Sequence, residues 1–286
     1  MKVGIVGLGL IGGSLGRAIV SKTSDKVFSY DIDKKAMLDG RLLSAYHEEL
    51  TDDNIKEIDV LFLSLYPEAL ESNIENYCAR LKKGCLVMDL SGNKRSIVSQ
   101  MKELSTRFPD LEFISAHPMA GREFSGVNHS TVNLFDKASM IFVPVNAKLQ
   151  TIAKFKEYFL SLGFLNVVMT TAEKHDEIIA FTSQLAHLVS SSYIKSERAS
   201  QFYGFSAGSF RDMTRVARLS PEMWAQLTLD NSDFLVEELD TLITHLNEYK
   251  VALKSKDKQK MKELLQDGND KKLQSEKIRR EKLNDR

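Results

Sequence analysis

The sequence predicts an α/β nucleotide-binding domain of the Rossmann type, followed by an all-α C-terminal domain. Through the first 170 residues, short apolar or β-branched runs alternate with amphipathic stretches, which is the pattern of a mostly parallel, doubly wound sheet. After Met169 the strand pattern stops, and residues 171–253 have the periodicity of helices. With 286 residues the chain is long enough for two domains. We therefore expect one domain over residues 1–170 and a second over residues 171–286.

The expected elements follow one another in a regular order. Short apolar or β-branched runs are candidate strands, at residues 2–6, 27–30, 60–65, 85–90, 112–115, 140–143 and 167–169. Amphipathic segments between them are candidate helices, at residues 11–20, 94–104 and 149–162. In the helical part, a Gly-containing stretch at residues 203–209 and the pair Ser220-Pro221 separate successive helices.

The last helical segment carries a stripe of apolar residues at alternating spacings of four and three. Its members are Leu235, Leu239, Leu242, Leu246, Tyr249 and Leu253. Such a stripe needs another helix to cover it, either from the same chain or from a second subunit. From residue 250 on, thirteen Lys and Arg stand against seven Asp and Glu, which predicts a solvated helical tail.

The composition excludes several classes of protein. Thirty-nine Lys and Arg balance thirty-nine Asp and Glu, so no net charge would recruit nucleic acid or an anionic membrane surface. No run of about 18 apolar residues could span a membrane, and glycines and Arg17 interrupt the apolar start before a signal-peptide pattern develops. Cys78 and Cys85 have no partner at metal-ligand spacing, which indicates reduced thiols and no metal site. We expect a cytoplasmic protein that binds neither nucleic acid nor membranes.

A glycine-rich turn follows the first predicted strand and opens the first helix. Its residues, all predicted to contact a cofactor, are Gly7, Leu8, Gly9, Leu10, Ile11 and Gly12. This Gly-x-Gly-x-x-Gly motif lies in the context that dinucleotide binding requires. Gly7 permits the tight turn, Gly9 lets the backbone approach a pyrophosphate, and Gly12 lets helix and strand pack closely. The helix N-terminus then faces the anion.

Two residues at the ends of later strands complete the predicted cofactor site. Asp31 ends the second strand, where its carboxylate can accept hydrogen bonds from ribose hydroxyls and its charge opposes a 2′-phosphate. Ser64 lies near the end of the strand at residues 60–65, on the edge where such sheets bind ligands. NAD is therefore expected rather than NADP, with Lys34 and Lys35 keeping a phosphate pocket open as the alternative.

His117 is the first candidate for chemistry. It directly follows a predicted strand and so falls on the carboxyl-end rim of the sheet. A proline, a glycine and a carboxylate follow it closely, which favours a functional over a structural histidine. A neutral imidazole, with a usual pKa of about 6.5, can accept a proton near neutral pH.

Five separated motifs give the sequence a specific pattern. They are Gly-Leu-Gly-Leu-Ile-Gly-Gly-Ser at residues 7–14, His-Pro-Met-Ala-Gly-Arg-Glu at 117–123, His-Asp-Glu at 175–177, Ser-Gln-Leu-Ala-His at 183–187 and Phe-Arg-Asp-Met-Thr-Arg at 210–215. In this order they resemble the prephenate/arogenate dehydrogenase family of tyrosine biosynthesis. The first motif is common to many dehydrogenases, whereas the second, followed by the helical histidine and arginine motifs, is specific to this family.

The resemblance implies NAD-dependent oxidative decarboxylation of prephenate to 4-hydroxyphenylpyruvate. In that reaction ring carbon 4 loses a hydride, the 4-hydroxyl loses a proton, and a carboxylate departs as carbon dioxide. The family match makes His117 the general base and Arg215 the arginine that grips the substrate carboxylate. His187 matches a histidine that contacts the substrate side chain, and Glu123 matches a carboxylate that shapes the pocket. Residues 175–177 are expected to begin the helical domain and secure its contact with the first domain.

One segment departs from the family pattern. Many members carry Asp-x-x-Ser-x-Lys, whose serine contacts the reacting hydroxyl. Here Asp89-Leu90-Ser91-Gly92-Asn93-Lys94 has glycine at that place and serine one position earlier. Ser91 becomes the catalytic partner if the turn shifts; otherwise water takes that role beside Gly92.

Several alternatives share parts of this pattern. Arogenate and 4-amino-4-deoxyprephenate dehydrogenases share the ring chemistry and differ in the side chain or the ring substituent. A β-hydroxyacid dehydrogenase shares the domain plan, but needs a catalytic lysine on a Gly-containing helix of the second domain, and no convincing one is present. The displaced serine is consistent with a non-catalytic NAD(H)-sensing protein, whereas the retention of His117 and Arg215 opposes that interpretation.

The family match also implies a homodimer, joined through a helical domain that binds substrate. The stripe over residues 235–253 would be costly to leave in water, which agrees with this arrangement. About thirty residues follow the stripe, too few for an appended regulatory fold of ~60 residues. Feedback inhibition by tyrosine would then act at the active site.

Overall fold

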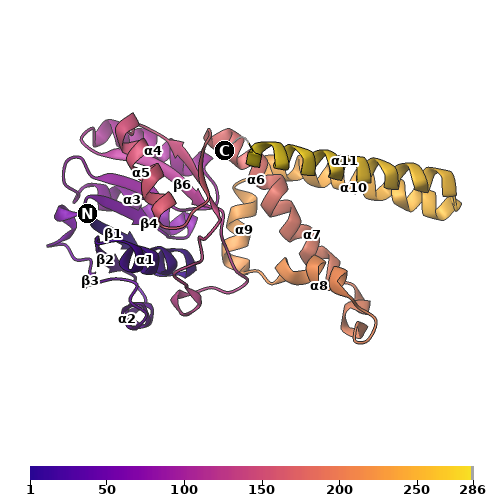
Figure 1. The fold of residues 1–286 in the computed structure, drawn as a ribbon, viewed down its shortest axis with the longest axis horizontal. Coiled ribbons are helices and arrows are strands. Elements are labelled where there is room, and N and C mark those ends of the chain that lie inside the picture. Colours follow the sequence, from indigo (N-terminus) through magenta and orange to yellow (C-terminus); the bar gives the residue numbers. More distant parts are fainter. Residues whose placement is uncertain (285–286) are drawn as a thin grey trace. The chain divides into compact units, whose positions relative to one another are not determined.

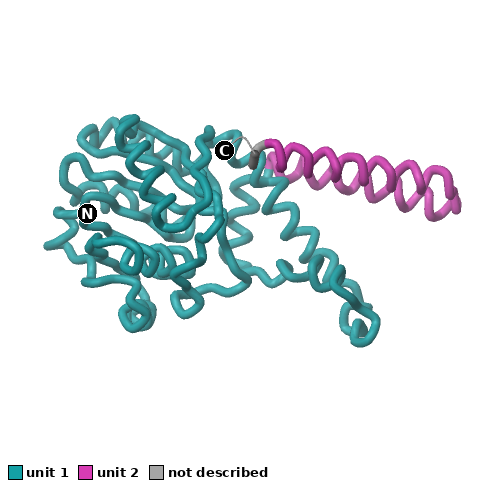
Figure 2. The backbone as a smooth tube through the Cα atoms, viewed as in Figure 1, with its two compact units in different colours: residues 1–232 teal, residues 233–286 magenta. Residues whose placement is uncertain are grey.

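The computed structural model describes residues 1–284, and its contacts divide the chain into a first unit, residues 1–232, and a second unit from residue 233 on (Figures 1 and 2). The first unit holds a β-sheet with helices on both faces and a further group of helices after the last strand. The second unit consists of long helices.

The sheet has eight strands. They are β1 (Lys2–Val6), β2 (Lys26–Tyr30), β3 (Glu48–Glu49), β4 (Val60–Leu63), β5 (Leu86–Asp89), β6 (Glu112–Pro118), β7 (Ser139–Pro144) and β8 (Asn166–Met169). Their order is β3-β2-β1-β4-β5-β6-β7-β8, and only the β6–β7 pair is antiparallel. The predicted mostly parallel, doubly wound sheet is therefore confirmed.

Most predicted strands differ from the observed ones by one or two residues at a boundary, and two differences are larger. The two-residue edge strand β3 was not expected, because so short a run has no periodicity. Strand β6 continues to Pro118 rather than ending at Ser115, because β7 pairs with it as far as the Pro118–Met140 register. His117 is therefore one of the last paired residues at the carboxyl end of β6 and does not lie beyond the strand.

Alternation of side chains along the strands builds a core on each face of the sheet. In β4, Val60 and Phe62 pack on one face, and Leu61 and Leu63 pack on the other. The first face is covered by α1 (Leu10–Lys22), α2 (Lys34–Leu42) and α5 (Leu149–Ser161). The second face is covered by α3 (Pro67–Cys78) and α4 (Arg95–Arg107). Both cores are apolar, as the strand pattern requires.

A group of helices follows β8 within the first unit. They are α6 (Ala172–Ile179), a π-helical segment (Ala180–Leu185), α7 (Ala186–Tyr193), α8 (Gly208–Thr214) and α9 (Pro221–Leu229). Short 3-10 turns occur at Ile55–Glu57, Val127–His129, Glu197–Gln201 and Arg215–Ala217. The predicted change from alternating strands to helices after Met169 is thus present.

The second unit contains α10 (Ser232–Ser255, of which Ser232 belongs to the first unit) and α11 (Lys258–Asn284). The hydroxyl of Tyr249 donates to the Leu264 carbonyl at 3.1 Å, so α11 supplies part of the cover that the apolar stripe needs. Leu246 and Leu253 of the same stripe are exposed in the single chain. The expected helical tail is present as α11.

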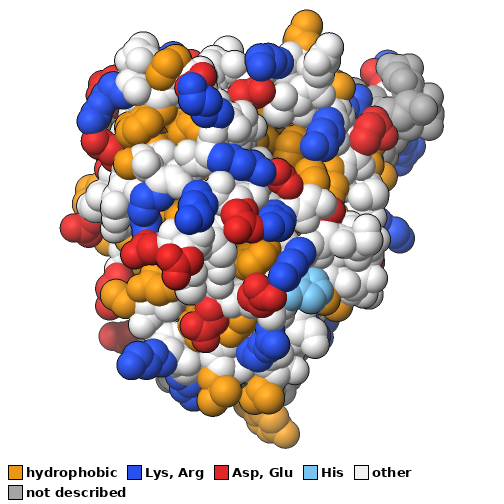
Figure 3. All heavy atoms as spheres, turned by 90° about the vertical axis from the view of Figure 1, so that its left-hand side faces the viewer, with side chains coloured by type: hydrophobic (Ala, Val, Ile, Leu, Met, Phe, Trp, Pro, Cys, Tyr) orange, Lys and Arg blue, Asp and Glu red, His pale blue; other side chains and the backbone are white. Residues whose placement is uncertain are grey.

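Acidic and basic side chains are interspersed on the face of the molecule in Figure 3. Within residues 1–284, no helix is long and apolar enough to cross a membrane. The described side chains also form no group of three or more His, Cys, Asp or Glu arranged to hold a metal ion.

Candidate active site

The glycine-rich turn lies where the sheet order reverses, between β1 and its neighbour β4. Gly7 has a φ of +92°, and a Cβ there would lie 2.2 Å from the Ser64 carbonyl oxygen. A Cβ on Gly12 would lie 1.9 Å from the carbonyl oxygen of Gly7. At Gly9, by contrast, a Cβ would meet nothing within 4 Å. Two glycines therefore permit close packing, while the third leaves an open approach to the backbone at the start of α1, which fits a dinucleotide pyrophosphate.

Asp31 lies directly beside this turn. One carboxylate oxygen accepts the Leu8 N–H at 2.6 Å, and the other accepts the Asp33 N–H at 2.8 Å. Each carboxylate oxygen can accept more than one hydrogen bond, so Asp31 keeps capacity for further donors. Lys35, one of the two lysines that favour the phosphate alternative, is paired with Asp39 at 2.5 Å. The structure thus brings together the glycine turn, Asp31 and Ser64.

His117 is the start of a chain of hydrogen bonds. Its Nδ1 lies 2.9 Å from Nε2 of His175, and Nδ1 of His175 lies 2.7 Å from Oδ1 of Asp176. Burial, followed by the neighbouring His175 and the Lys94 cation, holds the pKa of His117 well below its usual 6.5. The imidazole is therefore neutral near neutral pH, the form that can accept a proton.

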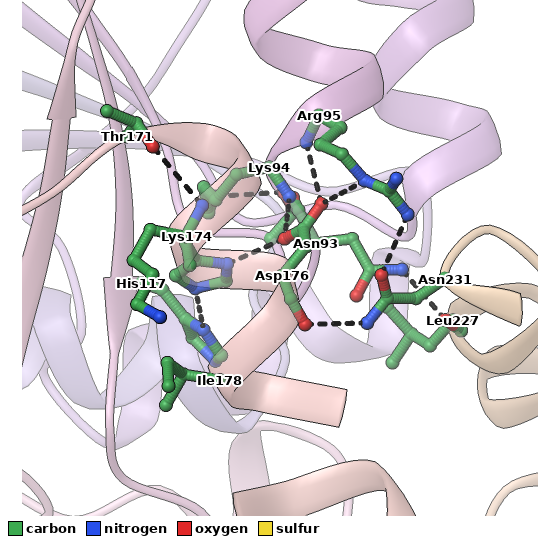
Figure 4. Close-up of polar contacts among 12 residues, drawn as sticks. Asn93, Lys94, Arg95, His117, Thr171, Lys174, Asp176, Ile178, Leu227 and Asn231 are labelled. Carbon is green, nitrogen blue, oxygen red and sulfur yellow. Dashed lines mark hydrogen bonds and ion pairs between the residues drawn. The ribbon is translucent and has the colours of Figure 1, made fainter. Parts of the chain in front are cut away.

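Asp176 is anchored at the N-terminus of α4 (Figure 4). Its Oδ1 accepts the backbone N–H of Lys94 at 2.8 Å, and its Oδ2 accepts that of Arg95 at 2.9 Å. Burial opposes ionisation, but the hydrogen bonds from His175 and from these two N–H groups leave the pKa of Asp176 below its usual value. A buried, ionised carboxylate therefore stands behind the pair of histidines.

A second buried cluster follows β5. Asp89 Oδ2 accepts from the Lys94 ammonium at 2.6 Å, from the Ser91 hydroxyl at 2.6 Å and from the Ser91 N–H at 2.9 Å. Lys94 also lies 3.1 Å from the Ser91 hydroxyl oxygen, and both Lys94 and Asp89 are fully buried. In the part of the chain that is described, no hydrogen bond joins Ser91 to His117. A Cβ at Gly92 would meet the side chain of Leu227 at 3.1 Å.

Buried amides tie the start of α4 to the helices after β8. Gln184, in the π-helical segment, donates to Asn93 Oδ1 at 2.9 Å and to the Leu227 carbonyl at 3.1 Å. The Asn231 amide donates to Gln184 Oε1 at 2.8 Å and to the Asp176 carbonyl at 2.9 Å. Segments of π-helix are frequent at functional sites, and this one holds a buried polar side chain in place.

Two of the predicted substrate residues, His187 and Arg215, lie among the helices that follow β8. Arg215, at the end of α8, forms an ion pair with Glu123 from the loop after β6. A hydrogen bond from its own backbone and the Arg215 guanidinium hold the pKa of Glu123 below its usual value. The His187 ring packs against Trp224 with ring centroids 4.1 Å apart and the ring planes tilted by 31°, and its Nδ1–H donates to the Ser183 carbonyl at 2.8 Å.

Sequence reasoning missed part of this arrangement. His175 and Asp176 were expected only at a domain contact, and Lys94 and Gln184 were not singled out although each lies in a quoted motif. Two adjacent ionisable residues in a family motif were the available signal for the His175-Asp176 pair. Asn231 carries no such signal.

Comparisons with known proteins place most of the chain in one family. A family model described as the prephenate dehydrogenase nucleotide-binding domain matches residues 15–168, and one described as the prephenate dehydrogenase dimerization domain matches residues 171–267. A cyclohexadienyl dehydrogenase of Zymomonas mobilis is 31% identical over 267 residues, which cover 89% of each chain. A prephenate dehydrogenase of Lactococcus lactis is 26% identical, over 93% of this chain and 75% of the relative.

The fold has a close counterpart among solved structures. The crystal structure of prephenate dehydrogenase from Aquifex aeolicus superimposes with a TM-score of 0.82 at 21% identity, over 95% of this chain and 99% of that one. At this identity the likeness concerns the fold, while the family models and the Zymomonas relative carry the assignment. The chain belongs to the prephenate dehydrogenase family of oxidoreductases.

Proposed function

We propose that this protein catalyses the NAD-dependent oxidative decarboxylation of prephenate to 4-hydroxyphenylpyruvate. The observation that carries the proposal is His117, a partly buried and neutral imidazole at the carboxyl end of β6, in the family motif at residues 117–123. Family membership indicates the class of reaction, and the site contains the types of side chain that this reaction requires.

The cofactor would bind at the glycine turn. The open backbone at Gly9 and the start of α1 would receive the pyrophosphate, and Asp31 and Ser64 would flank it. When bound, NAD supplies the acceptor for the hydride that leaves ring carbon 4. The Asp31 carboxylate favours NAD over NADP, because a 2′-phosphate would bring a second negative charge against it.

His117 would remove the proton of the 4-hydroxyl as general base. Loss of that proton favours formation of the ring carbonyl, and departure of the ring carboxylate as carbon dioxide leaves the electron pair that makes the ring aromatic. General-base help of this kind is typically worth ~10²–10⁴ in rate. Ser91, held by Asp89 and Lys94, stays a candidate for contact with the same hydroxyl.

Arg215 would bind a substrate carboxylate, and His187 would contact the substrate side chain. In the structure Arg215 is paired with Glu123, so the incoming carboxylate competes with Glu123 for the guanidinium. The ion pair is largely exposed and is therefore weak enough for such an exchange. We propose that residues 171–286 form the substrate-binding and dimerisation domain, and that the protein is a homodimer.

Arogenate is a second candidate substrate, because the Zymomonas relative is named for the wider cyclohexadienyl class. Purified protein is mixed with prephenate or arogenate, each with NAD or NADP, and the reduced cofactor is followed by its absorbance. We expect the highest kcat/KM with prephenate and NAD, and the His117→Asn variant serves as the matched control. Absence of reduced cofactor with every combination contradicts the proposal and favours the NAD(H)-sensing alternative. Faster turnover of arogenate, or of 4-amino-4-deoxyprephenate in a third series, reassigns the substrate.

A further inference from the structure

We propose that His175 and Asp176 are positioning residues that hold His117 with its proton on Nδ1, so that Nε2 presents its lone pair to the substrate hydroxyl. This inference rests on the proposed role of His117 as the general base. The side chains of His175 and Asp176 are at most 1% exposed, so water does not compete for their hydrogen bonds.

The direction of the hydrogen bonds is set from Asp176 outward. An ionised carboxylate can only accept, and both of its oxygens already accept N–H groups from the start of α4. Arg95 adds a guanidinium contact to Oδ2 at 3.3 Å. His175, 2.7 Å from Oδ1, must therefore donate from its Nδ1.

The single proton of a neutral imidazole then determines the next bond. Burial holds the pKa of His175 below its usual value, so this histidine carries one proton, on Nδ1. Its Nε2 can only accept, and the group 2.9 Å away is Nδ1 of His117. That atom must be the donor, because two lone pairs would otherwise face each other at hydrogen-bond distance.

His117 in turn has one proton to place, and it is used on His175. Nε2 is left as the unprotonated nitrogen, which is the atom that a general base needs. A serine protease uses the same logic when an aspartate fixes the tautomer of its histidine, and loss of that aspartate costs about 10⁴ in turnover. Here a second histidine lies between the carboxylate and the base.

Two other histidines provide internal references for the tautomer. Nδ1 of His47 accepts the backbone N–H of Val27 at 3.0 Å, so the proton of neutral His47 is on Nε2. Nδ1 of His187 donates to a backbone carbonyl, so its proton is on Nδ1. His47 and His187 therefore provide a reference for each tautomer outside the proposed chain.

The first test reads the tautomers directly. Full-length protein with ¹⁵N-labelled histidine is studied by NMR at pH 8 with NAD added, and resonances are assigned through single variants of His47, His117 and His187. We expect His117 to show the Nδ1-protonated pattern of His187 and the opposite of His47. A His117 ring protonated on Nε2 overturns the proposal, whether or not the enzyme turns over prephenate.

The second test separates positioning from structure. His175→Leu removes the acceptor, whereas the side-chain amide of His175→Gln can place an oxygen near the position of Nε2. We expect His175→Leu to lower kcat about 10–100-fold with KM for prephenate and Kd for NAD within threefold of wild type, and His175→Gln to recover most of the loss. His47→Gln is the matched control and keeps wild-type kcat.

The outcomes distinguish this inference from the proposed function. Wild-type kcat in His175→Leu, or equal losses in both His175 variants with raised KM, refutes positioning while leaving His117 as the base. Wild-type kcat in His117→Asn refutes the base itself. If His175→Leu does not fold, His175→Gln and the tautomer spectrum still decide, because a Gln variant with NAD bound and kcat reduced 100-fold would also contradict the proposed acceptor role.

Discussion

Replacing Gly9 and Gly12 by alanine, one at a time, should separate cofactor binding from folding. Gly9 has backbone angles of −77° and −160°, which alanine also adopts, and its added methyl meets no protein atom within 4 Å. Gly12 is different, because its methyl would lie 1.9 Å from the Gly7 carbonyl oxygen, where ordinary contacts begin at 3.4 Å. The turn and α1 would have to separate by roughly 1.5 Å to admit it, taking the difference between these distances.

The expected magnitudes follow from these contacts. Gly9→Ala should change the free energy of unfolding by no more than about 0.5 kcal/mol, as for other substitutions that touch nothing. Its methyl would stand where the pyrophosphate approaches, so Kd for NAD should rise at least tenfold, or about 1.4 kcal/mol. Gly12→Ala should cost about 1–3 kcal/mol of stability, the usual range for overpacking.

Calorimetric titration with NAD and urea unfolding measure the two quantities on the same samples. Unchanged NAD affinity in a folded Gly9→Ala protein would refute the placement of the pyrophosphate. Unchanged stability of Gly12→Ala would refute the argument from close packing. Gly84 is unsuitable as a control because its φ is +77°, whereas Gly121→Ala, which also meets nothing within 4 Å, provides an open site away from the glycine turn.

Four further expectations concern other parts of the chain. His117→Asn should lower turnover by about 10²–10⁴ with NAD affinity nearly unchanged, measured by steady-state kinetics and titration; near-wild-type turnover excludes it as the base. Because the folded pKa values of His117 and His175 are lowered, the unfolded chain binds more protons below pH 6.5, and the free energy of unfolding should fall as pH decreases from there, by at most about 1.4 kcal/mol per pH unit for each histidine. Urea unfolding between pH 5 and 8 checks this, and a stability that is flat over that window contradicts it. Asp31→Ala should relax the preference for NAD over NADP in kcat/KM, and unchanged discrimination rules out that role. Replacing both Leu242 and Leu246 by Glu should dissociate the proposed dimer, as judged by light scattering during size-exclusion chromatography; a folded, dimeric variant rejects this interface.

The sequence was informative wherever a short pattern determines the structure. A short apolar run predicted β1 at its observed bounds, and the glycine spacing predicted the turn between β1 and α1. The same reasoning could not find the full length of β6, because its last residues are fixed by pairing with β7, more than twenty positions away. Prediction from sequence patterns uses residues that are neighbours along the chain, and it contains no information on which strands pair in the sheet.

The candidate site divides in the same way. His117 was found from its place after a strand, but its contact with His175 joins residues 58 positions apart, and no local pattern encodes it. Ser91 was expected near the reacting hydroxyl, and the structure places its own hydroxyl against Asp89 and Lys94. Its catalytic role stays a prediction. Buried polar partners depend on which helices pack together, so they emerge only from the assembled fold.

The hydrogen bonds from the start of α4 to Asp176 limit how the chain can be truncated. The first N–H groups of α4 have no side-chain cap from their own segment, and the carboxylate that receives them comes from more than 80 positions further along the chain. A fragment ending at residue 170 would lose this cap, together with the amide partners of Asn93. Loss of the cap at a helix N-terminus typically costs about 0.5–2 kcal/mol. We therefore expect the sheet and its helices to be less stable when expressed without the helices that follow β8. Truncated proteins should retain the chain at least through Asn231.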